Sequence, residues 1–141
     1  MNKKNPVVEF KNVSRIYGSP GEGGVQITAL DNVSFKIFEG EYVAITGPSG
    51  SGKSTLLHLL GLLDRQSSGE IFMDGVETNK LKDNELAKLR NKKIGFVFQQ
   101  FNLLRKTSAL KNVELPLIYA GLSGNKRMEM AKNELIKVGL G

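Results

Sequence analysis

Gly47-Pro48-Ser49-Gly50-Ser51-Gly52-Lys53-Ser54 is the stretch that decides the fold of this chain. It follows an apolar, partly β-branched run at residues 42–46 and leads into a leucine-rich run at residues 53–63. The stretch fits the pattern G-x-x-x-x-G-K-[ST], which joins a buried strand to a helix and wraps its backbone around phosphate groups. We therefore expect a strand, a phosphate loop and a helix in this order.

The residue types in the loop suit phosphate chemistry. Its glycines let the backbone approach a phosphate closely, so that successive N–H groups and the N-terminus of the helix point at the anion. Lys53 supplies a positive charge for the β- and γ-phosphates, the Ser54 hydroxyl can ligate Mg²⁺, and Thr55 can reach the α-phosphate. The expected phosphate-binding residues are Gly47, Pro48, Ser49, Gly50, Ser51, Gly52, Lys53, Ser54 and Thr55.

Two other interpretations of this loop are weaker. A glycine-rich turn could contain Gly-Lys-Ser by chance, but the apolar run before it and the leucine-rich run after it are the context that a phosphate loop requires. A dinucleotide-binding loop would need G-x-G-x-x-G at the start of a helix, and the sequence has none there. Phosphate binding is therefore the favoured function.

Composition limits the remaining choices. The 141 residues contain no cysteine, which excludes a disulfide scaffold and a thiol nucleophile. The single histidine, His58, lies among leucines and is expected to be a packed or hydrogen-bonded structural residue. The net charge of +6 favours anionic partners without choosing among them. The basic cluster at residues 88–93 lacks interleaved aromatic residues, so we expect a solvated helix face and no nucleic-acid partner.

Strand and helix patterns alternate along the chain. Strands are expected at residues 7–13, 26–38, 42–46, 69–74 and 94–98, and helices at residues 53–63, 83–93, 109–119 and 125–138. The runs at 42–46 and 94–98 are typical of strands that are buried on both faces. The fold class is therefore α/β, and the first forty residues resemble an antiparallel addition.

The flanks of the loop resemble the ATP-binding domain of ABC transporters. The resemblance rests on residues 30–35 (LDNVSF), 39–41 (EGE), 69–71 (GEI), 74–75 (DG) and 94–99 (IGFVFQ). Residues 99–104 (QQFNLL) and 112–117 (NVELPL) are similar to the subfamily that serves lipoprotein release, macrolide export and antimicrobial-peptide export. The resemblance implies a P-loop NTPase with a RecA-like core and an antiparallel β subdomain, truncated here. Residues 1–106 would be the N-terminal part of that core, and residues 107–141 part of the α-helical subdomain.

The resemblance also implies roles for single residues. Tyr17 matches the aromatic residue that stacks on adenine, although a strand-end core aromatic is the alternative. Gln99 matches a glutamine that approaches Mg²⁺ and the attacking water; Gln100 could be confused with it, but the end of the expected strand favours Gln99. Lys53 and Gln99 are thus the implied catalytic residues, Ser54 and Gln99 the implied metal ligands, and ATP with Mg²⁺ the implied cofactors.

A surface for a membrane partner is implied just after Gln99. Phe101, Leu103 and Leu104 match the place where a transporter's coupling helix docks, with ordinary loop packing as the equal alternative. Arg105 departs from the proline often found there in the subfamily. The implied partners are a transmembrane permease and a second ABC domain, at the cytoplasmic face of the cell membrane.

Several motifs of a complete ABC ATPase are not found in this sequence: Leu-Ser-Gly-Gly-Gln, a strand ending in Asp-Glu, and a switch histidine. Residues 122–126 (LSGNK) and 71–74 (IFMD) resemble the first two only superficially. The resemblance as a whole implies an ATP-binding subunit that couples ATP hydrolysis to export or release of a substrate. The alternative is a nucleotide-binding fragment that does not hydrolyse ATP. An ABC-type ATPase acting on ribosomes or DNA and a small-molecule kinase fit the flanks less well.

Overall fold

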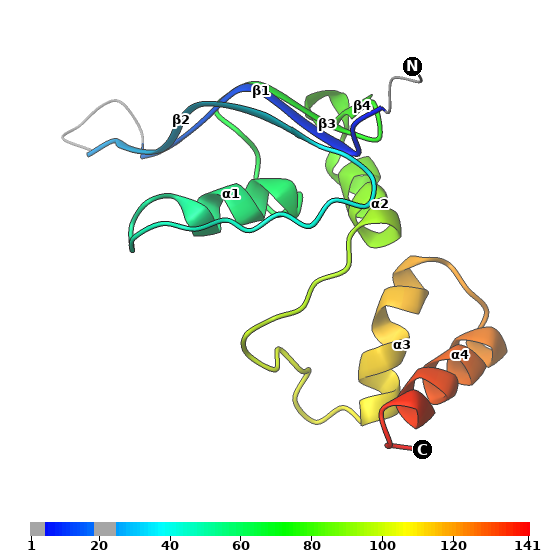
Figure 1. The fold of residues 1–141 in the computed structure, drawn as a ribbon. Helices are drawn as coiled ribbons and strands as arrows, with labels where there is room; N and C mark the ends of the chain where they lie inside the picture. Colours follow the sequence, from blue (N-terminus) through cyan, green and yellow to red (C-terminus); the bar gives the residue numbers. More distant parts are fainter. Residues whose placement is uncertain (1–4, 19–24) are drawn as a thin grey trace. The chain divides into compact units, whose positions relative to one another are not determined.

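The computed structural model describes residues 5–18 and 25–141. The chain forms two compact units, Met1–Leu86 and Ala87–Gly141 (Figure 1). Within the described ranges, no helix is both long and apolar enough to cross a membrane.

An antiparallel sheet organises the first unit. It consists of β1 (Val8–Tyr17), β2 (Ile27–Ile37), β3 (Ser68–Met73) and β4 (Val76–Glu77), in the order β2-β1-β3-β4. The central strand β1 pairs on both sides, since Val8 lies opposite Ile37 of β2 and Met73 of β3. The strands expected from the alternating patterns at residues 7–13, 26–38 and 69–74 are therefore confirmed.

The hydrophobic core lies between this sheet and the helix α1 (Lys53–Leu60), which runs along one face of it (Figure 1). Leu59 of α1 is completely buried, together with Phe10 and Val13 of β1. The ring of Phe10 stacks on that of Phe35 with centroids 4.6 Å apart. Because α1 follows the phosphate loop directly, packing of its leucines fixes the loop against the sheet.

Gly69 is a position where β1 and β3 approach too closely for a side chain. Its φ of 84° lies in the left-handed region. A Cβ at this position would also collide with the backbone carbonyl oxygen of Asn12. Both observations require glycine here.

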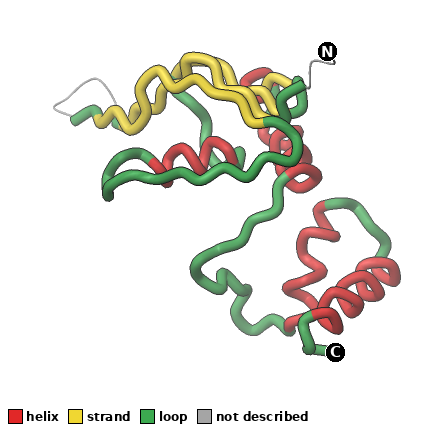
Figure 2. The backbone as a smooth tube through the Cα atoms, viewed as in Figure 1, coloured by secondary structure: helices red, strands yellow, loops and turns green. Residues whose placement is uncertain are grey.

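Residues 42–46 and 94–98 do not form the buried strands that their sequences predict. Both segments are irregular and are drawn as loop in Figure 2. Tyr42 is 98% exposed and Val97 is 101% exposed. A strand is held by hydrogen bonds to a neighbouring strand. Among the described residues, no strand pairs with either segment. Apolar sequence alone was therefore a misleading signal for burial.

The second unit is helical. The helix α2 (Asp83–Lys93) leads into it from the first unit, whose short 3₁₀ helix η1 (Thr78–Lys80) precedes α2. The helices α3 (Ala109–Tyr119) and α4 (Gly124–Lys137) then pack against each other and bury Ala131. The helices predicted at residues 83–93, 109–119 and 125–138 are confirmed, with Pro116 inside α3.

A candidate nucleotide-binding site

The phosphate loop, residues 47–54, ends at the exposed N-terminus of α1. Gly52 is the N-cap residue, and no side chain caps the helix. The first bond of the helix joins the Leu56 N–H to the Gly52 carbonyl oxygen at 2.9 Å, which leaves the N–H groups of the preceding turn outside the helical ladder. The first turn holds no acidic residue. This end of α1 therefore carries the positive pole of the helix and suits an anion.

Gly52 also fixes the loop to the sheet. Its φ is 84°, and a Cβ there would collide with the carbonyl oxygen of Ala29 and lie 3.0 Å from Leu30 Cδ2. Both neighbours belong to β2. Only glycine permits this approach, and the approach holds the loop beside β2.

The ammonium group of Lys53 lies inside the curve of the loop. Its Nζ donates to the carbonyl oxygens of Gly47 at 2.9 Å and Pro48 at 2.6 Å, and lies 3.5 Å from Ser51 Oγ. A lysine has three N–H donors, and the longest of these contacts is the easiest to exchange for a phosphate oxygen. The charge is therefore already held at the centre of the loop.

The other residues of the expected phosphate set are neighbours of Lys53 in the chain. Pro48, Ser49 and Ser54 are exposed, and Thr55 is half-buried in the first turn of α1. Among the described residues, no group of three or more histidines, aspartates and glutamates could hold a metal ion. One hydroxyl such as that of Ser54 fits Mg²⁺ all the same, because this ion keeps several water ligands and is usually bound together with substrate phosphates.

Tyr17 ends β1 and is held by two residues that sequence reasoning missed. Its hydroxyl donates to Asp64 Oδ2 at 2.9 Å, and Arg15 Cζ lies 4.4 Å from the centre of its ring. The side chain remains 37% exposed. Asp64 is 47 positions away in the chain, so no local pattern could have revealed the pair.

Gln99 and the expected docking residues belong to the second unit. Gln99 is exposed and does not end a strand, in contrast to the expectation. The docking residues are also exposed: Phe101 by 93%, Leu103 by 64% and Leu104 by 50%. The bend that carries them is fixed at Leu104, whose N–H donates to Asn112 Oδ1 at 2.9 Å.

Three further sequence features have clear positions in the structure. His58 is exposed, so the expectation of a packed residue was wrong. Of the leucines around it, Leu56, Leu59 and Leu60 pack in the core, whereas Leu57 is 54% exposed. Residues 71–73 belong to β3 and pair with β1 in the antiparallel sense. Ser123 is the N-cap residue of α4.

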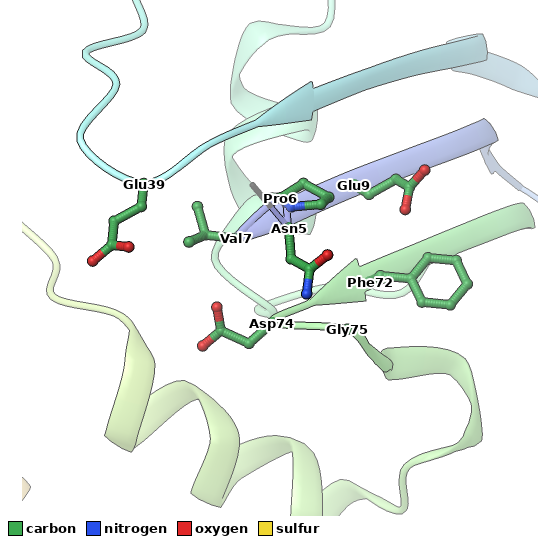
Figure 3. A pocket seen from close by; sticks show the side chains of 8 residues that line it. All are labelled: Asn5, Pro6, Val7, Glu9, Glu39, Phe72, Asp74 and Gly75. Carbon is green, nitrogen blue, oxygen red and sulfur yellow. The ribbon is translucent and has the colours of Figure 1, made fainter. Parts of the chain in front are cut away.

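A pocket elsewhere on the first unit is acidic (Figure 3). Glu9, Glu39 and Asp74 contribute carboxylates to its lining. A hydrogen bond from the ammonium of Lys36 lowers the pKa of Glu9 below its ordinary value, and the positive charge of Lys11 adds to this effect. Fixed negative charge repels phosphates, so this pocket does not compete with residues 47–54 as a nucleotide site.

Known proteins with similar sequences support the same assignment. The profile of the ABC transporter family matches residues 30–140. The chain is 54% identical to an uncharacterized ABC transporter ATP-binding protein of Thermotoga maritima, across 96% of this chain and 56% of that protein. It is 49% identical to the macrolide export ATP-binding/permease protein MacB of Hyphomonas neptunium, across 96% of this chain and 21% of that protein.

Solved structures agree with the sequence relatives. A dimeric structure of the ATP-binding cassette MJ0796 bound to ADP and Pi is 51% identical, with a TM-score of 0.77, and the match covers 89% of this chain and 54% of that one. MJ0796 is a protein of Methanocaldococcus jannaschii.

These matches define the class of protein: the chain has the fold of an ABC ATPase cassette, with an antiparallel sheet beside a phosphate loop. The chain belongs to the ABC transporter family. The predicted resemblance to the ATP-binding domains of this family, including those of macrolide exporters, is confirmed. The chain spans about half the length of the Thermotoga maritima relative.

Proposed function

We propose that this chain binds Mg-ATP at residues 47–54 as the ATP-binding part of a transporter that exports or releases a substrate. The observation that carries the proposal is the ammonium of Lys53, held inside the loop by the carbonyl oxygens of Gly47 and Pro48 at the open N-terminus of α1. Ser54 would ligate Mg²⁺, and Tyr17 would stack on the adenine. Mg²⁺ would neutralise charge on the phosphates when bound.

In the whole transporter, hydrolysis would use Lys53 for the charge on the phosphates and Gln99 near the metal and the attacking water. A neutral amide suits the latter task because it can accept from water and ligate a metal without adding charge. The 141-residue chain by itself would bind ATP without hydrolysing it. Its sequence contains no apolar strand that ends in Asp-Glu, so it lacks the glutamate that would act as general base toward the attacking water.

Partner contacts follow from the same assignment. The exposed side chains of Phe101, Leu103 and Leu104 would dock a transmembrane permease, as the combined ATP-binding/permease name of MacB suggests. The dimeric MJ0796 cassette supports pairing with a second ABC domain. Residues 1–106 would contribute core and residues 107–141 helical subdomain, peripheral on the inner face of the membrane.

Calorimetric titration with Mg-ATP tests the proposal, with phosphate release measured in the same sample. We expect binding without turnover, and we expect Lys53→Ala to weaken binding by at least about tenfold, because it removes a charge-assisted contact. Lys126→Ala, which removes an exposed lysine of α4, is the matched control and should leave binding unchanged.

Binding that survives Lys53→Ala would place the nucleotide elsewhere. Turnover by this chain that requires Lys53 would contradict the expected lack of hydrolysis while supporting the site.

A further inference from the structure

We propose that Arg15 and Asp64 are positioning residues, which hold the Tyr17 ring so that one face is presented to the adenine base. The inference rests on the proposed ATP binding and adds to it a device for placing the base.

Asp64 anchors the rim of the ring. Its Oδ2 accepts the hydrogen bond from the Tyr17 hydroxyl at 2.9 Å and lies 2.9 Å from Arg15 Nε. Its Oδ1 accepts from the backbone N–H of Arg65 at 2.8 Å. Both oxygens of the carboxylate are thus in use, so the acceptor for the hydroxyl is itself fixed.

Arg15 covers one face of the ring. Its guanidinium carbon lies 4.4 Å from the ring centre, a distance typical of a cation–π contact. The side chains of Arg15 and Asp64 are only 22% and 26% exposed, whereas Tyr17 as a whole is 37% exposed. In the described part of the chain, Arg15 is the one cation that lies over this ring. We assign the opposite face to the base, because Arg15 covers the first face and the residue as a whole stays 37% exposed.

The ring and the phosphate loop are fixed to the same stretch of β2. Tyr17 pairs with Ile27, and Arg15 pairs with Leu30. Gly52 of the loop lies against Ala29 and Leu30 of that stretch. One short strand segment therefore sets where both the base and the phosphates of a single nucleotide would lie.

Holding the ring in advance lowers the cost of binding. A tyrosine free to rotate would lose side-chain entropy when a base stacks on it, and a pre-ordered ring does not. The contacts of Arg15 and Asp64 should therefore raise affinity for the base while leaving affinity for the phosphates unchanged.

The test compares ATP with tripolyphosphate, which carries the phosphates without the base, by calorimetry in the presence of Mg²⁺. Arg15→Met and Asp64→Ala should each weaken ATP binding by about threefold to tenfold and leave tripolyphosphate binding unchanged. Tyr17→Phe, which keeps the ring and removes only the hydroxyl, should fall between these variants and the parent chain.

Lys11→Met is the matched control. Lys11 also lies on β1, with its Nζ 4.2 Å from the centre of the Phe72 ring and 3.9 Å from the Glu70 carboxylate. This variant removes the same kind of contact elsewhere on the sheet, so ATP binding should not change.

A double substitution shows whether Arg15 acts through the ring. In a Tyr17→Leu background, Arg15→Met should have no further effect on ATP affinity. Equal losses for ATP and tripolyphosphate, no loss for either ligand, or an undiminished Arg15 effect in that background would each overturn the inference. If the parent chain bound neither ligand, the proposed function itself would be wrong. If tripolyphosphate still bound and this binding required Lys53, the proposed phosphate site would stand, and only the roles of Arg15 and Asp64 would be at issue.

Discussion

Two neighbouring stretches of the first unit, β2 (Ile27–Ile37) and residues 42–46, carry similar apolar and β-branched residues but have different structures. β2 forms a ladder with β1 and contributes Leu30 to the core. Residues 42–46 are irregular and mostly exposed, with Tyr42 at 98%, Val43 at 52% and Ile45 half-buried. The difference teaches that side-chain pattern predicts the capacity to form a strand, while the partner strand decides whether one forms.

Truncating an aromatic residue in each kind of region tests this comparison with the largest expected effect. Phe10→Ala removes a buried ring that stacks on Phe35 and should cost about 3–5 kcal/mol of unfolding free energy. Tyr42→Ala should change it by less than about 0.5 kcal/mol, because the side chain is exposed. Urea unfolding followed by circular dichroism measures both. A similar loss for the two variants would mean that residues 42–46 are packed in solution.

Substituting one glycine in the sheet and one beside residues 42–46 tests the same comparison, with a smaller expected effect on the free energy of unfolding. Gly69 in the sheet and Gly40 beside residues 42–46 have φ values of 84° and 82°, but only at Gly69 would a Cβ meet backbone. Gly40→Ala should cost about 1 kcal/mol from backbone strain alone. Gly69→Ala should cost more than about 2 kcal/mol, because β1 and β3 must also move apart. Equal costs, again from urea unfolding, would indicate that the two strands separate easily.

The smallest expected effect concerns pH. Because the hydrogen bond from Lys36 lowers the pKa of Glu9 from 4.5, the folded chain holds this carboxylate ionised more readily than the unfolded chain does. Its contribution is present above the unfolded pKa and is lost as pH falls through the folded value. When the pH is lowered from about 6 to about 3, the urea midpoint of unfolding should therefore fall slightly less for Glu9→Gln than for the parent chain. An identical loss would show that the Lys36 contact adds nothing to the stability of the sheet edge.

Much of the fold could be predicted because its signals are local. The alternating runs around Phe10 and Ile71 gave correct strands, and the helix after Lys53 and the helix containing Pro116 also lie where their patterns indicated. The exceptions were residues 42–46 and 94–98. Their expected burial depended on neighbouring strands, which the sequence pattern of a segment does not contain.

The candidate site divides in the same way. Consecutive residues predicted the phosphate loop, because glycines, a lysine and a serine at this spacing can bind phosphate through backbone geometry and chemistry within one turn of chain. The sequence by itself also indicated the family. Only the tertiary structure decided that Gly52 lies against Ala29 and that Arg15 and Asp64 hold the Tyr17 ring. Those contacts join residues far apart in the chain, and they exist only after the sheet and α1 have packed together.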